Sequence, residues 1–88
     1  MRLVSAWLDF RTIRHKESRA ASARYLSMRT GKAYTASRLW EWEHGARSTP
    51  EVVVKIMREE LLPVLLDEAG ITEGKMRKKV AKVIEVLL

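Results

Sequence analysis

The most informative part of this 88-residue sequence is residues 35–50, which read TASRLWEWEHGARSTP. Thr35 is a typical N-cap residue, and a helix that starts there and runs to about His44 places Leu39 and Trp42 on one inward face. Gly45 follows in the position where helices commonly end. We therefore expect a short helix with an apolar back and a polar outward side, followed by a loop.

Two further helices are predicted before this segment. In the first fifteen residues, apolar side chains recur at intervals of four, three and three, as on one side of an amphipathic helix: Leu3, Trp7, Phe10 and Ile13. The polar side of this helix is expected to carry Arg2, Asp9, Arg11 and Arg14. Ser18 is the expected N-cap of an alanine-rich second helix, from Arg19 to about Met28, and Gly31 is the expected turn residue after it.

The clearest helix start lies after residue 48. Thr49 is expected to cap this helix, Pro50 to take its first position and Glu51 to favour the helix dipole. The apolar positions are Val53, Ile56, Met57, Leu61 and Leu65. Pro63 is expected to end or kink the helix near Leu62, or to open a short new one.

A last amphipathic helix is predicted in residues 71–88, after Gly70 and with Thr72 as its cap. One side of it, spaced at four, three and four, is interpreted either as core or as a coiled-coil-like dimer seam: Met76, Val80, Val83 and Leu87. The basic run is interpreted as a solvated face: Lys75, Arg77, Lys78, Lys79 and Lys82. The chain thus reads as an all-α protein of five or six short helices, with a domain in residues 1–70 and an added C-terminal helix for packing or dimerisation.

Composition narrows the classes of function. The net charge is +6, with a pI of about 10.1, and all of the excess lies in residues 1–50, which hold ten basic and four acidic side chains. A half-basic chain indicates a surface that faces a polyanion. The absence of cysteine excludes disulfides and thiolate metal sites, so a reducing cytoplasm is the expected compartment. No apolar run approaches the length of a membrane span, and no membrane partner is expected.

Residues 35–50 resemble the third helix and the following loop of the Cro/phage-repressor class of helix-turn-helix proteins. The class combines a polar N-cap, an apolar residue, Trp-Glu-x-Gly, a basic residue and a Pro-led helix. Here these places are taken in order by Leu39, the segment 42–45, Arg47 and Pro50. The resemblance covers roughly residues 5–62 and implies a lambda-repressor-like helix-turn-helix bundle that binds duplex DNA as a homodimer.

The resemblance also implies the contacts. It places base contacts at Ala36, Ser37 and Glu41, and we add Arg38 because a guanidinium suits guanine O6 and N7. Phosphate contacts are implied at the start of the second helix and after the third: Ser18 or Arg19, then His44, Arg47 and Ser48. Thr35 is included because helix N-termini bind phosphate through backbone N–H groups. The connection between the two helices is longer than is usual in the class, which makes Arg29, Lys32 and Tyr34 an additional contact loop.

Several of these residues also fit structural roles or a metal site. Trp42 is expected in the core, and Trp40 is expected to pack on the fourth or first helix rather than to stack on a base. Glu43 is expected to pair with Arg11 or Arg14. Glu41 and His44 have the spacing of a metal-binding pair, but a di-metal bundle needs more ligands than this chain offers. We therefore expect no metal, no cofactor, no catalytic residue and no enzymatic activity.

The resulting prediction is a cytoplasmic, nucleoid-associated transcriptional regulator of phage or bacterial type. It is expected to act as a repressor on a palindromic operator, without a small-molecule effector. The main alternative is a helical protein-interaction module on the same scaffold, such as an antitoxin or an inhibitor. An RNA-binding module is the third alternative, although the chain lacks the paired aromatics or Gly-x-x-Gly clamp of single-strand recognition.

Overall fold

The computed structural model describes residues 2–70 and 74–87, with the side chains of all of these except 84–87. The described residues form five helices and no strand: α1 (Arg2–His15), α2 (Arg19–Thr30), α3 (Ala36–Glu43), α4 (Glu51–Glu68) and α5 (Gly74–Leu87). The chain is therefore all-helical, as expected. The predicted cap Thr72 lies outside the described residues. No helix in the described ranges is long and apolar enough to span a bilayer.

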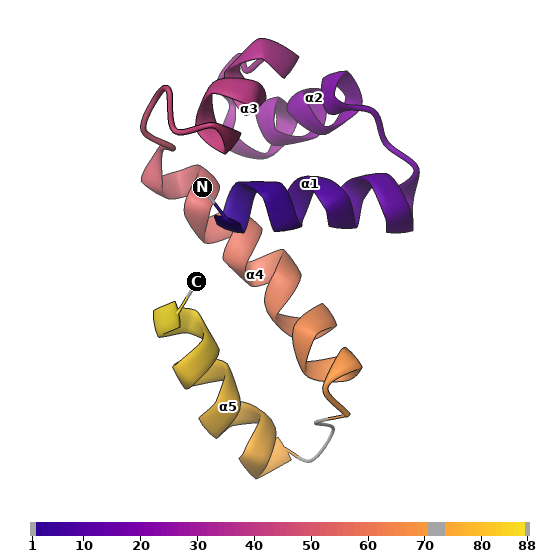
Figure 1. Ribbon diagram of the computed structural model, residues 1–88, viewed down its shortest axis with the longest axis vertical. Helices are drawn as coiled ribbons and strands as arrows, with labels where there is room; N and C mark the ends of the chain where they lie inside the picture. The colour runs from indigo at the N-terminus through magenta and orange to yellow at the C-terminus, as the bar shows by residue number, and fades with distance from the viewer. Residues whose placement is uncertain (1, 71–73, 88) are drawn as a thin grey trace.

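The helices form two groups that share α4. Helices α1, α2 and α3 gather around the first part of α4, while α5 turns back and runs beside α4 in the opposite direction (Figure 1). Helix α5 packs on α4 and on no other described helix. The whole molecule measures 39 × 25 × 23 Å along its principal axes. Its length comes from the second part of α4 and from α5, which extend beyond the other helices (Figure 1).

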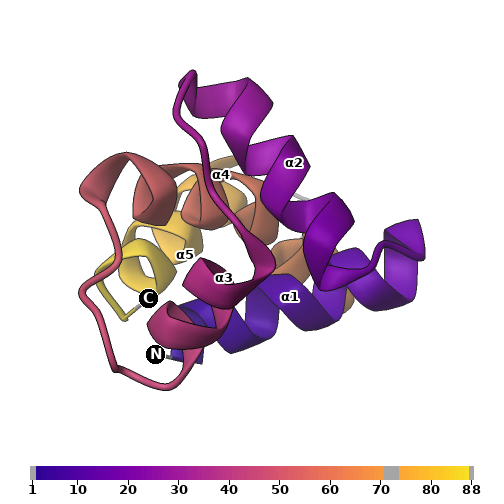
Figure 2. The same cartoon turned by 90° about the horizontal axis from the view of Figure 1, so that it is seen from above.

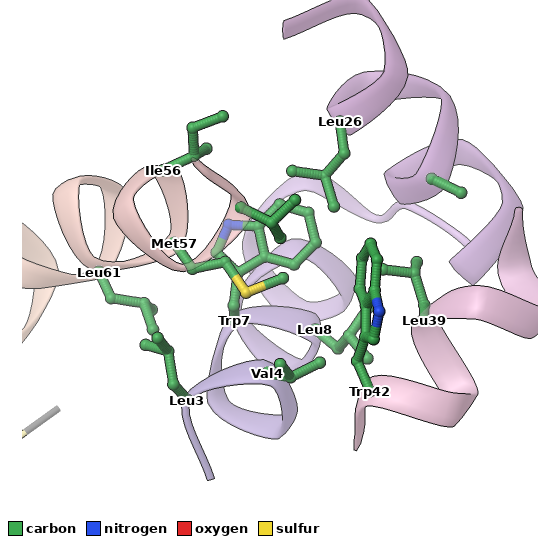
Figure 3. Close-up of a cluster of buried hydrophobic side chains, with 12 residues drawn as sticks. Leu3, Val4, Trp7, Leu8, Leu26, Leu39, Trp42, Ile56, Met57 and Leu61 are labelled. Carbon is green, nitrogen blue, oxygen red and sulfur yellow. The ribbon is translucent and has the colours of Figure 1, made fainter. Parts of the chain in front are cut away.

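The core lies between α1, α2, α3 and α4. Its largest fully buried side chains come from all four helices: Val4, Trp7, Ser22, Leu26, Leu39, Trp42, Val53 and Met57. Figure 3 shows how the apolar members of this cluster meet, with Trp7 reaching in from α1 and Trp42 from α3. The inward positions of Leu39 and Trp42 confirm the prediction for the third helix. Among the described side chains of α5, residues 74–83, none belongs to this cluster.

The predicted faces of α1 were partly wrong. The buried residues are Leu3, Val4, Trp7, Leu8 and Arg11, whereas Phe10 is half-buried and Ile13 is 71% exposed. At about 100° per residue, the buried set forms one stripe with Arg11 near its middle, and Ile13 falls on the opposite side. Arg11 is tolerated there because its guanidinium binds two carboxylates, with Nε 2.8 Å from Glu17 Oε1 and Nη1 3.5 Å from Glu60 Oε1.

The ends of α2 and α3 follow the predicted local signals. The Ser18 hydroxyl accepts a hydrogen bond from the Ala21 N–H at 3.1 Å, and the Thr35 hydroxyl accepts one from the Arg38 N–H at 3.3 Å. Gly31 and Gly45 both have φ +72°, the left-handed conformation that favours glycine after a helix. Both predicted N-caps and both predicted glycine stops are confirmed.

The prediction for α4 was wrong in three details. Pro50, not Thr49, is the N-cap residue, and its carbonyl accepts hydrogen bonds from the N–H groups of Val53 and Val54. The helix neither ends near Leu62 nor gives way to a new one, but continues through Pro63 to Glu68, and the alternative of a kink at Pro63 stays a prediction. Leu66 is buried where Leu65 was expected, and Leu65 is 38% exposed. Burial of Leu61 and Leu66 on either side of Pro63 offsets the cost of about 3 kcal/mol for proline inside a helix.

Candidate nucleic-acid interface

Helix α3 lies at the surface, with α1 behind it and α2 beside it (Figure 2). Because Leu39 and Trp42 face the core, the helical repeat places Ser37 and His44 at the centre of the opposite side. Ser37 and His44 are exposed in the structure. Trp40 flanks them on one edge and Glu41 on the other. Because Leu39 and Trp42 pack on the core, the opposite side of α3, which is polar and aromatic, faces outward.

Two arginines surround the carboxylate of Glu41. Arg47, from the loop after α3, places its Nε 3.1 Å from Glu41 Oε2. Arg38, one turn earlier, places its Nε 3.8 Å from Glu41 Oε1. Both arginine side chains are partly exposed, at 39% for Arg38 and 53% for Arg47. The negative charge of Glu41 is therefore compensated locally, and the exposed edges of both guanidinium groups face solvent.

Trp40 and His44 form a stacked pair on the other edge of this side. Their ring centroids are 4.1 Å apart and their planes differ by 18°. His44 Nδ1 lies 2.9 Å from the Trp40 carbonyl oxygen, so this ring nitrogen donates to that oxygen. Trp40 is 50% exposed. The described ring contact of Trp40 is with His44, the C-cap residue of α3, and its packing on the fourth or first helix stays a prediction.

An ion pair joins the start of α2 to the end of α3. Arg19 Nη1 lies 2.6 Å from Glu43 Oε1, and the hydrogen bond from Arg19 lowers the pKa of the Glu43 carboxyl. The predicted partners of Glu43 were therefore wrong. Arg11 binds Glu17 and Glu60 instead, and Arg14 Nη2 lies 3.0 Å from Glu68 Oε1. The sequence identified Glu43 as structural but not the helix from which its arginine comes.

The connection from α2 to α3 is held against both helices. The Ser27 hydroxyl accepts from the Tyr34 N–H at 2.9 Å and lies 3.3 Å from the Tyr34 carbonyl oxygen. The Tyr34 ring meets Trp42 edge-on, with centroids 5.0 Å apart. Tyr34 is half-buried in this contact, whereas Lys32 is exposed. Of the three residues predicted as a contact loop, Lys32 is the one that the structure leaves at the surface without a fixed role in packing.

Arg29 is directed toward α4 instead of along the loop. Its Nη1 donates to the Tyr25 hydroxyl at 2.7 Å and lies 3.1 Å from Glu60 Oε2. Glu60 also accepts hydrogen bonds from Trp7 Nε1, at 2.8 Å, and from the Tyr25 hydroxyl. Burial, together with the hydrogen bond to Glu60, raises the pKa of Tyr25. Glu60 is thus the shared acceptor that joins α1, α2 and α4, and Arg29 is part of that network.

The predicted contact residues fall into three places. On or beside the outward side of α3 lie Ala36, Ser37, Arg38, Glu41, His44, Arg47 and Ser48; Arg19 is joined to its end through Glu43, and Ser18 precedes Arg19 as the N-cap of α2. Thr35 and the exposed Lys32 lie before its start. Arg29 and Tyr34 are engaged in packing. The sequence reasoning missed Trp40 as a surface residue, although the helical repeat that placed Ser37 outward also brings Trp40 to its flank.

The predicted seam on α5 is exposed where it is described. Met76 and Val83 are 59% and 60% exposed, Val80 is half-buried, and the side chain of Leu87 lies outside the described residues. Arg77 Nη1 lies 2.7 Å from Asp67 Oδ1, which ties the start of α5 to the end of α4. Within the chain, Met76 and Val83 are therefore not core.

No group of three or more potential metal ligands occurs among residues 2–70 and the described side chains of α5. Comparison with protein-family models, with curated proteins and with solved structures gave no match.

Proposed function

We propose that this protein is a sequence-specific, duplex-DNA-binding transcriptional regulator. Its scaffold would be a helix-turn-helix bundle of the Cro/phage-repressor class, in which α2 supports α3 and α3 enters the major groove. Bound at an operator, the protein would repress by blocking polymerase.

One observation carries this proposal: one side of α3 is packed on the core and the opposite side is exposed. Leu39 and Trp42 are fully buried, while Ser37, Trp40 and His44 are exposed on the opposite side. A recognition helix needs this arrangement, because its back must be fixed on the domain while its front reads base edges. The excess positive charge of residues 1–50 supplies attraction to the phosphate backbone.

The side chains in front have complementary roles in this proposal. Arg38 suits a bidentate contact to guanine, and Ser37 suits several base edges. Arg47 and Arg19 lie at the end of α3, where they would meet phosphates on the two sides of the groove. Each of them also pairs with a glutamate, Glu41 or Glu43 respectively, so those carboxylates do not face the phosphates uncompensated.

The protein is proposed to act as a homodimer, with half-sites about 10 bp apart. The exposed apolar residues of α5, Met76 and Val83, favour this helix as the contact between protomers. Val83→Asp tests it, because this exposed side chain contributes little to the fold of one chain. Sedimentation should show a dimer for the parent protein and a monomer for the variant. An unchanged dimer would place the interface elsewhere.

The function itself is tested by selecting ligands from a random duplex library and measuring affinity by fluorescence anisotropy. Arg38→Ala should weaken binding by about 1–3 kcal/mol and relax preference at one base pair. Arg47→Ala should weaken binding to all duplexes alike and flatten the salt dependence. The control is Arg14→Ala, an exposed arginine that pairs with Glu68 near the far end of α4.

Because Arg47 also compensates Glu41, the Arg47 effect is measured in two backgrounds. In the Glu41→Gln background, Arg47→Ala leaves no unpaired carboxylate near the DNA. If Arg47 contacts a phosphate, Arg47→Ala should therefore lower duplex affinity as much in this background as in the parent. If neither Arg38→Ala nor Arg47→Ala changes duplex affinity, the proposal fails. Selection of no duplex at all would favour the protein-interaction alternative.

A further inference from the structure

The strongest feature that the proposed contacts do not use is the exposed tryptophan of α3. Large apolar side chains at a surface usually mark an interaction site when other binding residues surround them. Trp40 is 50% exposed and lies on the same side of α3 as Ser37. Trp40 does not belong to the buried core cluster, to which α3 contributes Leu39 and Trp42.

The structure also fixes how this indole is presented. His44 covers one ring face by stacking at 4.1 Å, and the hydrogen bond between His44 Nδ1 and the Trp40 carbonyl oxygen holds the imidazole in that position. A ring that is already restrained loses little conformational entropy on binding. Side chains of helical residues lean toward the N-terminus, so Trp40 leans toward Ala36 one turn earlier. Ala36 and Trp40 thus form an apolar strip beside the Ser37 hydroxyl.

In the major groove, one exposed group is apolar: the C5-methyl group of thymine. Bases in a duplex are stacked on each other, so a ring on α3 meets their edges and not their faces. We propose that Trp40, with Ala36, contacts a thymine methyl group and makes the protein select an A·T pair at that position. This inference rests on the proposed function, because it requires α3 to lie in the major groove.

The test replaces thymine by deoxyuridine, which lacks the methyl group but keeps every hydrogen-bonding atom. Each thymine of the selected duplex is replaced singly, and affinities are measured for the parent and for Trp40→Ala. At one position the parent should lose about fourfold in affinity, the value of one buried methyl group. Trp40→Ala should bind the two duplexes equally well there. Ser37→Ala is the matched control on the same side of α3, and it should keep the parent's sensitivity to the methyl group.

Trp40→Leu is a second variant, to be used if Trp40→Ala fails to fold. Leucine keeps an apolar contact, so Trp40→Leu should keep part of the affinity difference between the thymine and deoxyuridine duplexes. Equal methyl sensitivity in the parent and in Trp40→Ala overturns the inference and leaves the proposed function standing. The inference is likewise overturned, with the proposed function left standing, if the selected site contains no A·T pair or if no deoxyuridine replacement changes the affinity of the parent. Tighter binding of single strands than of duplexes, dependent on Trp40, would instead indicate base stacking and overturn it. Failure to select any duplex overturns both proposals.

Discussion

The four helices around Trp7 and Trp42 are held together differently from the hairpin that α4 makes with α5. In the four-helix part, apolar side chains from every helix are fully buried, and the carboxylate of Glu60 joins α1, α2 and α4. Helix α5 packs on one neighbour, leaves Met76 and Val83 exposed and is tied to α4 by Arg77 and Asp67. The difference shows that the buried core cluster lies among α1, α2, α3 and α4, while Met76 and Val83 of α5 stay exposed.

The largest effect is expected from the centre of the four-helix part. Trp42→Ala removes a side chain that is 1% exposed and should cost about 3–5 kcal/mol of unfolding free energy. Chemical denaturation followed by circular dichroism measures it. Trp40→Ala, two residues away on the exposed side, is the matched control and should cost much less. Equal losses for the two tryptophans would contradict the orientation of α3.

The buried arginine of α1 should rank next. Arg11→Ala removes the buried cation that pairs with the carboxylates of Glu17 and Glu60 and should cost about 2–3 kcal/mol. Arg14, an exposed arginine on the same helix, pairs with Glu68, and Arg14→Ala should cost less than about 1 kcal/mol. The same denaturation experiment compares them. A larger loss for Arg14 than for Arg11 would contradict the buried position of Arg11.

Substitution of one valine in each region compares how much the four-helix part and α5 contribute to the free energy of unfolding. Val53 in α4 is fully buried and Val83 in α5 is 60% exposed. Val53→Ala should cost about 2 kcal/mol, from two lost methyl groups and the cavity left behind. Val83→Ala should stay within about 0.5 kcal/mol when measured at protein concentrations where the chain is monomeric. Similar costs at both positions would remove the distinction between the two regions.

The cap of α3 should have a smaller effect. Thr35→Ala removes the acceptor of the Arg38 N–H and should cost about 1 kcal/mol, whereas Thr35→Ser keeps the hydroxyl and should cost less. Thermal unfolding resolves this difference. If alanine and serine behave alike, the hydroxyl does not stabilise α3.

The smallest expected effect concerns pH. Arg19 lowers the pKa of Glu43, and Arg11 lowers that of Glu17, so each carboxylate stabilises the fold above its usual pKa of 4.5. That stability is lost as pH falls through the lowered pKa values, because the unfolded chain binds these protons first. Glu43→Gln should lower stability at pH 7 by less than about 1 kcal/mol and reduce the loss between pH 5 and 3. An unchanged acid profile would show that the Arg19 pair contributes nothing.

The local features of this fold could be predicted because their causes lie within a few residues. Ser18 and Thr35 cap helices through N–H groups three residues on, and Gly31 and Gly45 end helices through their own backbone freedom. The expected helix end at Pro63 was wrong because burial of Leu61 and Leu66 outweighs a local preference. The predicted contact residues are located by the structure, but their role in binding DNA stays a prediction.

The sequence by itself determined that this chain is helical, where α2 and α3 begin and end, and which two residues of α3 face inward. Those results depend on capping and on the helical repeat, which act over one or two turns. The tertiary structure alone decided that Arg11 is buried, that Glu43 pairs with Arg19, that Arg29 serves Glu60 and that Trp40 remains outside. These outcomes depend on how helices distant in sequence are placed against each other. The periodicity of one helix does not indicate which residues of another helix will contact it.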